Sequence, residues 1–318
     1  MEDGLDRIIV LHIGAGKHNE KSRNDYVKLM KKALKKGDII AVNNILEHSS
    51  LTNTGYGSSL NILGEVEIDA SYYKSNGESG ALSGLQVDSP TQEMFRIFNK
   101  INDQHNTTGE QRLTRPVSLN CTSLKRYMDI PTNENLVSAK SKRIYDMYKD
   151  RILKYHGDEV INDTIGSIVI DTRFNHTALA TTSGGHFFKL PGRIGCAGIV
   201  GAAIYYEKIN DLEISCMCSG NGEQIIQTSL AQSIVKNVRY IDEGDYGPQL
   251  ERLIQEMTPQ IYCGFIVVLK RSNGRIQLLY GHTTESFYFG TRVHDATRVI
   301  LSCAEQEGKF TFGEYKLR

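Results

Sequence analysis

The part of the chain that most constrains its fold is the ten-residue stretch 162–171, in which Thr164 separates a polar segment from an apolar run. Residues 165–170 are mostly β-branched, and such a run is typical of a buried strand. Threonine is itself β-branched and is an ordinary first residue for a strand. These residues alone therefore favour a purely structural role for Thr164, and only the surrounding motifs can indicate another.

Six short glycine-containing motifs surround Thr164 in a fixed order. They read His-Ile-Gly-Ala-Gly at 12–16, Asn-Thr-Gly-Tyr-Gly at 53–57, Gly-Ala-Leu-Ser-Gly at 80–84, Thr-Thr-Ser-Gly-Gly at 181–185, Lys-Leu-Pro-Gly-Arg-Ile-Gly at 189–195 and Cys-Ser-Gly-Asn-Gly-Glu at 218–223. Each motif alone is weak, but the ordered set resembles the isoaspartyl peptidase/asparaginase family of N-terminal nucleophile (Ntn) hydrolases. Within that family the chain most resembles the threonine aspartases (taspases). The resemblance covers most of the chain and is weakest at about 102–157.

The resemblance implies an α/β (α+β) fold, the four-layer αββα Ntn-hydrolase sandwich. We expect one domain over residues 1–318, which self-cleavage would divide into segments 1–163 and 164–318. The polar stretch at about 103–157 has the poorest apolar periodicity, and we expect it to be a mobile loop. Periodicity elsewhere predicts helices near 22–36, 38–50, 89–102, 197–206, 224–236 and 250–257, and strands near 6–12, 65–70, 165–170, 177–182, 212–218, 261–269 and 277–280.

The charge balance argues against a nucleic-acid partner and against binding to an anionic membrane, because basic and acidic residues each number 37. No apolar run is long enough to span a bilayer, and the acidic start lacks the features of a signal peptide. The six cysteines show neither disulfide-framework nor metal-site spacing, and we expect no metal and no other cofactor. These features predict a cytoplasmic protein, with the nucleus as a second candidate location.

The resemblance makes Thr164 the candidate nucleophile. A threonine hydroxyl needs a base, and an N-terminal threonine can use its own α-amine, whose pKa is ~8. Thr164 gains that amine only if the Asp163–Thr164 bond is cleaved, which the family achieves by attack of the threonine hydroxyl on the preceding carbonyl. Asp163 would assist this cleavage; its other interpretation, a surface carboxylate in a loop, is comparable without the family context.

Three further catalytic residues follow from the resemblance. Ser183 would orient the hydroxyl or amine of Thr164. Ser219 and Gly220 match the pair that stabilises the oxyanion, through one hydroxyl and one backbone N–H. A Ser-Gly turn before a helix is the simpler interpretation of that pair, and only the order of the motifs favours the catalytic one.

Arg193, Asn53 and Gly14 are the candidate binding residues. The planar guanidinium of Arg193 suits a substrate carboxylate, although an arginine after Pro-Gly is more often a solvated loop residue. Asn53 would position the active-site loop or the substrate. Gly14 would let the backbone approach Thr164, and this assignment rests on the least specific signal.

Cys196 is the chief departure from the asparaginase pattern. Asparaginases carry an aspartate there, three residues after the arginine, that pairs with the α-ammonium of a free amino acid; taspases also lack it. The sequence therefore predicts a self-processing threonine endopeptidase that cuts protein or peptide substrates after aspartate, with a homodimer of cleaved αβ units as a candidate assembly. The alternatives are an L-asparaginase or β-aspartyl peptidase acting on small substrates, and a non-catalytic interaction module.

Overall fold

The computed structural model describes residues 6–105, 114–133, 135–150, 164–257, 261–306 and 308–318. The predicted cleavage residue Asp163 and parts of the stretch 103–157 lie outside these ranges. The described part of that stretch contains β4 (Ser118–Asn120), α4 (Cys121–Leu124) and α5 (Ala139–Tyr148).

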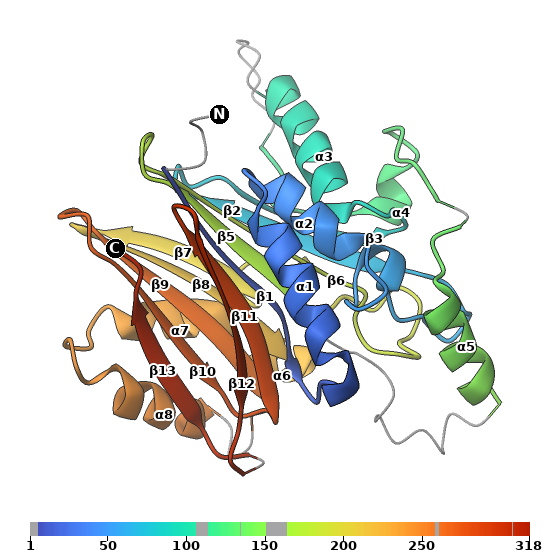
Figure 1. The fold of residues 1–318 in the computed structure, drawn as a ribbon. Coiled ribbons are helices and arrows are strands. Elements are labelled where there is room, and N and C mark those ends of the chain that lie inside the picture. The colour runs from blue at the N-terminus through green and yellow to red at the C-terminus, as the bar shows by residue number, and fades with distance from the viewer. Residues whose placement is uncertain (1–5, 106–113, 134, 151–163, 258–260, 307) are drawn as a thin grey trace.

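Two β-sheets form the centre of the molecule (Figure 1). The larger has eight strands in the order β12 (Ala296–Cys303), β11 (Ser286–Val293), β1 (Arg7–Gly16), β5 (Ile165–Asp171), β6 (His176–Ser183), β2 (Ile68–Lys74), β3 (Ser79–Leu85) and β4. The smaller has five, in the order β13 (Thr311–Lys316), β10 (Ile276–His282), β9 (Cys263–Arg271), β8 (Leu212–Gly220) and β7 (Ile204–Ile209). All neighbouring strands are antiparallel except β3 and β4.

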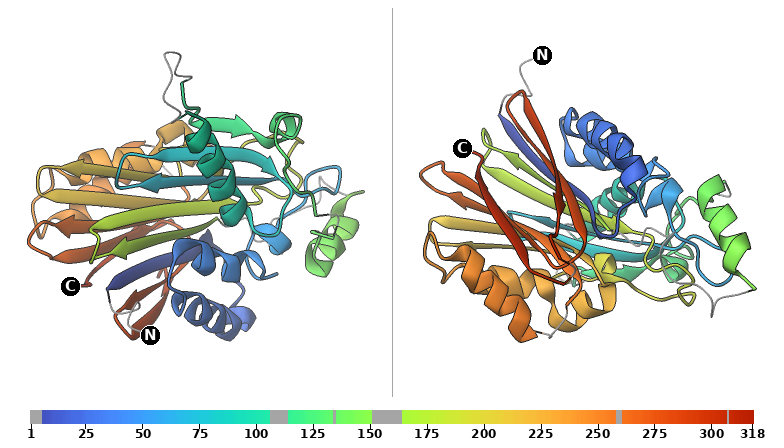
Figure 2. Two further views of the ribbon diagram at one scale, coloured as in Figure 1. Left: turned by 90° about the horizontal axis from the view of Figure 1, so that it is seen from above. Right: turned by 60° about the horizontal axis from the view of Figure 1, so that its bottom comes forward.

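Helices cover the outer face of each sheet (Figures 1 and 2). The larger sheet carries α1 (Arg23–Leu34), α2 (Ile39–Glu47) and α3 (Pro90–His105), and the smaller carries α6 (Gly222–Thr228), α7 (Leu230–Val238) and α8 (Tyr246–Met257). This arrangement confirms the predicted four-layer αββα sandwich. None of the helices in the described ranges is long and apolar enough to cross a membrane.

Strand alternation explains why Thr164 lies between the sheets. On β5, Ile165 and Val169 pack against the helices, whereas Ile168 and Ile170 pack between the two sheets. Side chains of a strand point alternately to opposite faces, so the even-numbered Thr164 shares the inter-sheet face. Burying each such isoleucine stabilises the fold by roughly 1.5–3 kcal/mol, which strongly disfavours a slip in register.

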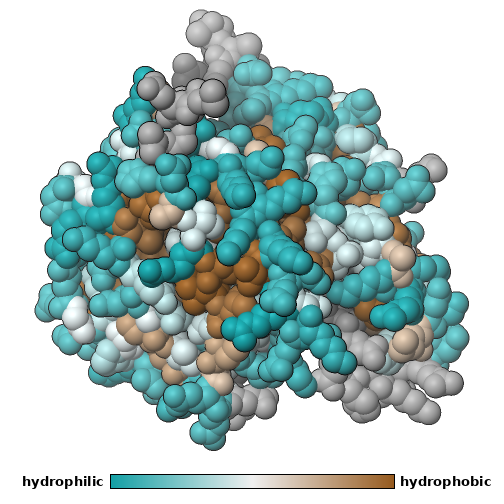
Figure 3. Space-filling view, viewed as in Figure 1, coloured by the Kyte–Doolittle hydropathy of each residue, from teal (hydrophilic) through white to brown (hydrophobic). Residues whose placement is uncertain are grey.

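The same alternation places Ser219 opposite Thr164. On β8, Met217 packs between the sheets, and Cys216 and Cys218 face the helices α6 to α8. Ser219 therefore points into the inter-sheet layer as Met217 does. Most large apolar residues lie inside these layers, and the surface shown in Figure 3 is therefore mostly hydrophilic. Some apolar side chains are nevertheless exposed near the middle of this face.

The predicted helix at 197–206 is wrong. The chain there forms a single 3-10 turn, Cys196–Gly198, and then enters strand β7, which pairs with β8. Gly201 has a φ of +93°, a conformation that breaks a helix, and the residues after it gain ladder hydrogen bonds at the edge of the smaller sheet. The predicted helix at 224–236 is likewise divided into α6 and α7 at Ser229, which has a φ of +46°.

Candidate active site

Thr164 lies immediately before β5 and is 2% exposed. Its backbone N–H donates to Ser219 Oγ over 3.3 Å, and its Oγ1 lies 4.0 Å from the sulfur of Cys196. Ser219, the predicted oxyanion donor, and Cys196 therefore both contact the predicted nucleophile Thr164, although they are distant from it in the sequence.

Ser219 has its hydroxyl oxygen fixed from two sides. The N–H groups of Thr164 and Ala15 both donate to Oγ, over 3.3 and 3.1 Å. A hydroxyl has two acceptor lone pairs and one proton, so the proton of Ser219 remains for a third partner. A negatively charged oxygen formed near Thr164 is a suitable partner.

Gly220 and Gly14 are positions at which only glycine fits. Gly220 ends β8 with a φ of +133°, and a Cβ there would collide with the carbonyl oxygen of Tyr262. Gly14 has a φ of +121° and lies in an irregularity of the pairing between β1 and β11. This bulge brings the next N–H, that of Ala15, to Ser219. Among the described residues no hydrogen bond joins Gly14 to Thr164 directly.

Ser183 ends β6, the strand beside β5. Ile165 pairs with Thr182, and continuing this antiparallel register places Ser183 opposite Thr164 on the same face. Directly opposed residues of this kind have Cβ atoms about 4.5–5.5 Å apart. The hydroxyl of Ser183 accepts a hydrogen bond from Gly185 N over 3.1 Å, which turns the chain away at the end of the strand.

Asn53 stabilises this turn through hydrogen bonds from its side chain and its backbone. Its side-chain amide donates to Gly185 O over 2.8 Å, and its Oδ1 accepts from Ser59 N over 2.7 Å. Its backbone carbonyl accepts from Gly184 N over 2.7 Å. Asn53 is 1% exposed, so these contacts correspond to the loop-positioning role rather than to direct contact with a substrate.

Arg193 is held in a cradle of glycines. A Cβ on Gly185, Gly195 or Gly222 would lie 2.8, 2.5 or 2.9 Å from its terminal nitrogens. Its Nε and Nη2 donate to Glu223 Oε1 over 2.9 and 2.7 Å. Nη1 makes no hydrogen bond to any described residue, so that edge of the guanidinium remains for a carboxylate. Glu223 belongs to the motif at 218–223, but the sequence does not reveal that its partner is Arg193.

Cys196 opens the 3-10 turn beside Thr164 and is 3% exposed. Burial raises the pKa of its thiol to about 11, so the side chain is neutral at physiological pH. The position at which the resemblance predicts an aspartate in asparaginases is therefore an uncharged thiol next to the predicted nucleophile.

Asp69 is a site residue that the sequence motifs do not reveal. It lies on β2 directly opposite Ser183, and its Oδ2 accepts a hydrogen bond from Gly195 N over 2.7 Å. Ile68 and Ala70 pack against the helices, and this alternation was the available signal that Asp69 faces the inter-sheet layer. A lone aspartate in a strand carries no further mark of function.

His12 is a second residue that sequence reasoning leaves without a role. It lies on β1 opposite Gly166, where a Cβ would collide with the imidazole. Complete burial lowers its pKa to about 3, while the main chain of Thr164 acts in the opposite direction. Neither ring nitrogen makes a hydrogen bond of acceptable geometry with a described residue. The ring is therefore a neutral group packed near the backbone of Thr164, the predicted nucleophile.

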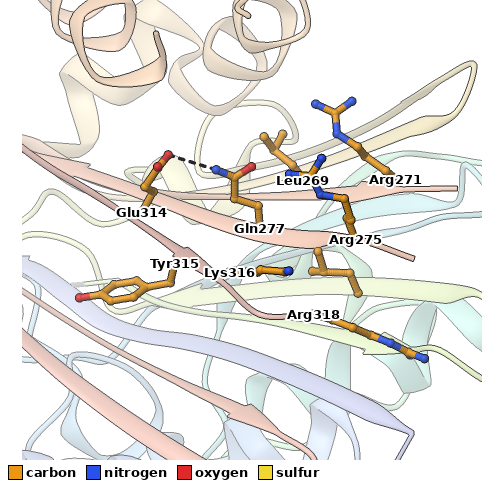
Figure 4. Close-up of a pocket in the computed structure, with 9 residues that line it drawn as sticks. Leu269, Arg271, Arg275, Gln277, Glu314, Tyr315, Lys316 and Arg318 are labelled. Atoms are coloured by element: carbon orange, nitrogen blue, oxygen red, sulfur yellow. Dashed lines mark hydrogen bonds between the residues drawn. The ribbon is translucent and has the colours of Figure 1, made fainter. Parts of the chain in front are cut away.

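Surface pockets also lie away from Thr164. One of about 160 Å³ is lined by Arg271, Arg275, Lys316 and Arg318 (Figure 4). Arg271 is at the opposite end of β9 from Cys263, the residue that pairs with Gly220, so this pocket is far from Thr164. Glu243 already pairs with both Arg271 and Arg275. Within the described ranges, no three His, Cys, Asp or Glu side chains are grouped so as to hold a metal ion.

Comparisons with known proteins agree with this geometry. A sequence model of the asparaginase family (Asparaginase_2) matches residues 6–301. An isoaspartyl peptidase/L-asparaginase of Xenopus laevis is 28% identical over 246 residues, covering 73% of this chain and 75% of the relative. A plant-type L-asparaginase of Pyrococcus abyssi is 27% identical over 258 residues, covering 73% and 79%. The family match extends over most of the chain and includes Thr164, Arg193 and Ser219. The chain therefore belongs to the asparaginase family of Ntn hydrolases.

Proposed function

We propose that this protein is a self-processing threonine endopeptidase of the taspase type, which cleaves protein substrates after aspartate. The observation that carries this proposal is the neutral thiol of Cys196 at 4.0 Å from Thr164 Oγ1. A free amino acid bound at Arg193 needs an anion for its α-ammonium, and burying that cation without a partner costs several kcal/mol. An aspartate within a polypeptide has no free ammonium and does not need the anion.

The neighbouring carboxylate of Asp69 does not replace the missing one. Asp69 is 1% exposed, and its Oδ2 is already bonded to Gly195 N. The positive charges of Lys189 and Arg193 also act on it. A carboxylate that is covered by the loop and electrostatically compensated from the protein side offers little to a substrate cation.

In the proposed reaction, Thr164 Oγ1 attacks the carbonyl carbon of the bond that follows the substrate aspartate. The hydroxyl proton moves to the α-amine of Thr164, and the Ser219 hydroxyl and the Gly220 N–H stabilise the oxyanion. The C–N bond breaks as the amine returns the proton to the leaving group, which leaves an ester on Thr164. Water then attacks the ester by the reverse proton path. Arg193 Nη1 would bind the aspartate side chain throughout.

Maturation would use the same groups once, within the chain. Thr164 Oγ1 would attack the carbonyl of Asp163, the peptide would shift from nitrogen to oxygen, and water would release the new N-terminus. The uncut chain supports this proposal in one respect, because Thr164 N already lies against Ser219 Oγ.

A second candidate is an isoaspartyl peptidase or L-asparaginase acting on small substrates. The names of the relatives favour it, since those cited above are called isoaspartyl peptidase/L-asparaginase or plant-type L-asparaginase. Glu223 also supports it, because this half-exposed carboxylate beside Arg193 is the group that could contact a substrate ammonium.

One experiment separates the two candidates. The processed protein is given L-asparagine, a β-aspartyl dipeptide and a library of aspartate-containing peptides, and ammonia and peptide products are followed. We expect cleavage after aspartate in the library with little ammonia. Rapid ammonia release without peptide cleavage would establish the second candidate instead.

Replacing Ser219 by alanine tests the oxyanion role. We expect Ser219→Ala to lower kcat by about 10²–10³-fold with little change in KM, because the hydroxyl acts on charge that develops only in the transition state. The matched control is Ser215→Ala, on the same strand and also buried. An unchanged kcat in processed Ser219→Ala protein would remove Ser219 from the site.

A further inference from the structure

A buried carboxylate lies beneath the loop that carries Arg193 and Cys196. Asp69 extends from β2 into the inter-sheet layer beside Ser183. Its Oδ2 accepts the Gly195 N–H over 2.7 Å. The residue that forms this bond is 126 positions earlier in the sequence than Gly195.

The loop is shaped to sit on this carboxylate. A Cβ on Gly195 would lie 3.3 Å from Asp69 Oδ2, and one on Gly198 would lie 3.2 Å from Asp69 Cβ. Glycines therefore bracket Cys196 and allow the main chain to approach. A Cβ on Gly195 would also lie 2.5 Å from Arg193 Nη1, so the guanidinium packs against the main chain that this bond holds.

Several titratable and charged groups face Asp69. Lys189 and Arg193 of the loop, Cys196 of the 3-10 turn and Cys121 of α4 are near enough to interact with it electrostatically. Burial raises the pKa of Asp69 to about 6, whereas Lys189, the Gly195 N–H, Arg193 and the Gly84 main chain act in the opposite direction. The carboxylate is therefore ionised at neutral pH and becomes protonated in mild acid.

We propose that Asp69 is a positioning residue that holds Arg193 and Cys196 in the substrate-binding arrangement only while its carboxylate is ionised. The ionised form makes the stronger hydrogen bond to Gly195 N and attracts the positive charges of Lys189 and Arg193 toward β2. The inference rests on the proposed role of Arg193, and it extends that role by making substrate binding sensitive to acid.

Protonation of Asp69 should weaken substrate binding but should not destabilise the folded protein. The folded pKa lies above the ordinary value of about 3.9, so the folded chain binds the proton more tightly than the unfolded chain. Stability contributed by Asp69 therefore rises as pH falls from about 6 to about 4. Acid should weaken substrate binding through Asp69 without melting the protein.

The kinetic test is the pH profile of the substrate that the processed protein turns over best. In the wild type, protonation of the Thr164 amine gives log(kcat/KM) a slope of about 1 below pH ~8. Protonation of Asp69 should steepen this slope to about 1.5 between pH ~6 and pH ~5, because the protonated form binds the substrate only about tenfold more weakly. Asp69→Asn resembles the protonated form in shape and charge. It should raise KM about tenfold at pH 7, change kcat less than about twofold, and remove the steeper limb.

Hydrogen exchange of the segment 190–199 tests the loop without requiring turnover. In Asp69→Asn at pH 7 this segment should exchange about tenfold faster than in the wild type. Below pH ~6 the wild type should approach the rate of the variant, once both rates are corrected for the pH dependence of intrinsic amide exchange. Ser71→Ala is the matched control: it lies two residues along β2, is buried, and its hydroxyl makes no hydrogen bond to a described residue. It should leave exchange unchanged.

Persistence of the steeper limb in Asp69→Asn, or exchange equal to that of the wild type, would overturn the inference. Failure of the proposed function looks different, because it appears as ammonia release without peptide cleavage or as no turnover on any substrate, while the exchange experiment still decides the role of Asp69. A lower melting temperature in Asp69→Asn than in Ser71→Ala would assign Asp69 to general stability and would also overturn it.

Discussion

Replacing Thr164 by alanine should leave the chain uncut and reduce hydrolysis by at least about 10⁴-fold. The substitution removes the Oγ1 hydroxyl that lies 4.0 Å from the sulfur of Cys196, on the residue whose backbone N–H donates to Ser219. Loss of a nucleophile abolishes every covalent step, so the effect is larger than that of any supporting residue. Intact-mass measurement of the purified protein after incubation reports the cleavage, and the substrate assays report the turnover.

Thr164→Ser is the informative partner of this variant. It keeps the hydroxyl and loses one methyl group from a position that is 2% exposed, so partial cleavage and partial activity are expected. If Thr164→Ala protein yielded the same two fragments as the wild type, another protease would be responsible and the self-processing proposal would be wrong.

The parts of the fold that could be predicted from the sequence depend on local constraints. The run after Thr164 predicts a strand because its residues are β-branched, and the structure has β5 at Ile165–Asp171. Asp38 is the first residue of the helix predicted at 38–50, and in the structure it caps α2 by accepting a hydrogen bond from Ala41 N. In each case the residues that determine the element are its own or its immediate neighbours.

The errors arise where distant contacts outweigh local preference. The segment 197–206 is apolar enough for a helix, yet pairing with β8 makes its second half an edge strand. The contact between Asp69 and Gly195, 126 residues apart, leaves no trace in either local sequence. The motifs locate Thr164, Arg193 and Ser219 because the family relationship supplies the long-range information that periodicity lacks.

Replacing Cys196 by aspartate should convert the substrate preference. The carboxylate would lie where the thiol now approaches Thr164, within the field of Arg193, and would supply an anion for a free α-ammonium. A charged hydrogen bond in a buried site contributes about 1.5–3 kcal/mol, which corresponds to about 10–150-fold in kcat/KM. We therefore expect hydrolysis of L-asparagine and of β-aspartyl dipeptides to rise by about 10²-fold.

Cleavage of aspartate-containing peptides should fall in the same variant. A polypeptide brings no ammonium to compensate the new carboxylate, which then competes with the substrate for Arg193. The measurement is the ratio of kcat/KM for the dipeptide to that for the peptide, on protein whose processing has been verified by mass.

Cys196→Asn controls for size and polarity, since it has the shape of aspartate without the charge. It should not gain activity on small substrates, because an amide gives an ammonium only a neutral acceptor. An equal gain in the aspartate and asparagine variants would show that the shape of the side chain at position 196, rather than its charge, limits the hydrolysis of these small substrates. Rapid hydrolysis of L-asparagine by the wild type would show that another group, with Glu223 the foremost candidate, already holds the ammonium, and the choice between the two functions would then rest on Glu223 rather than on Cys196.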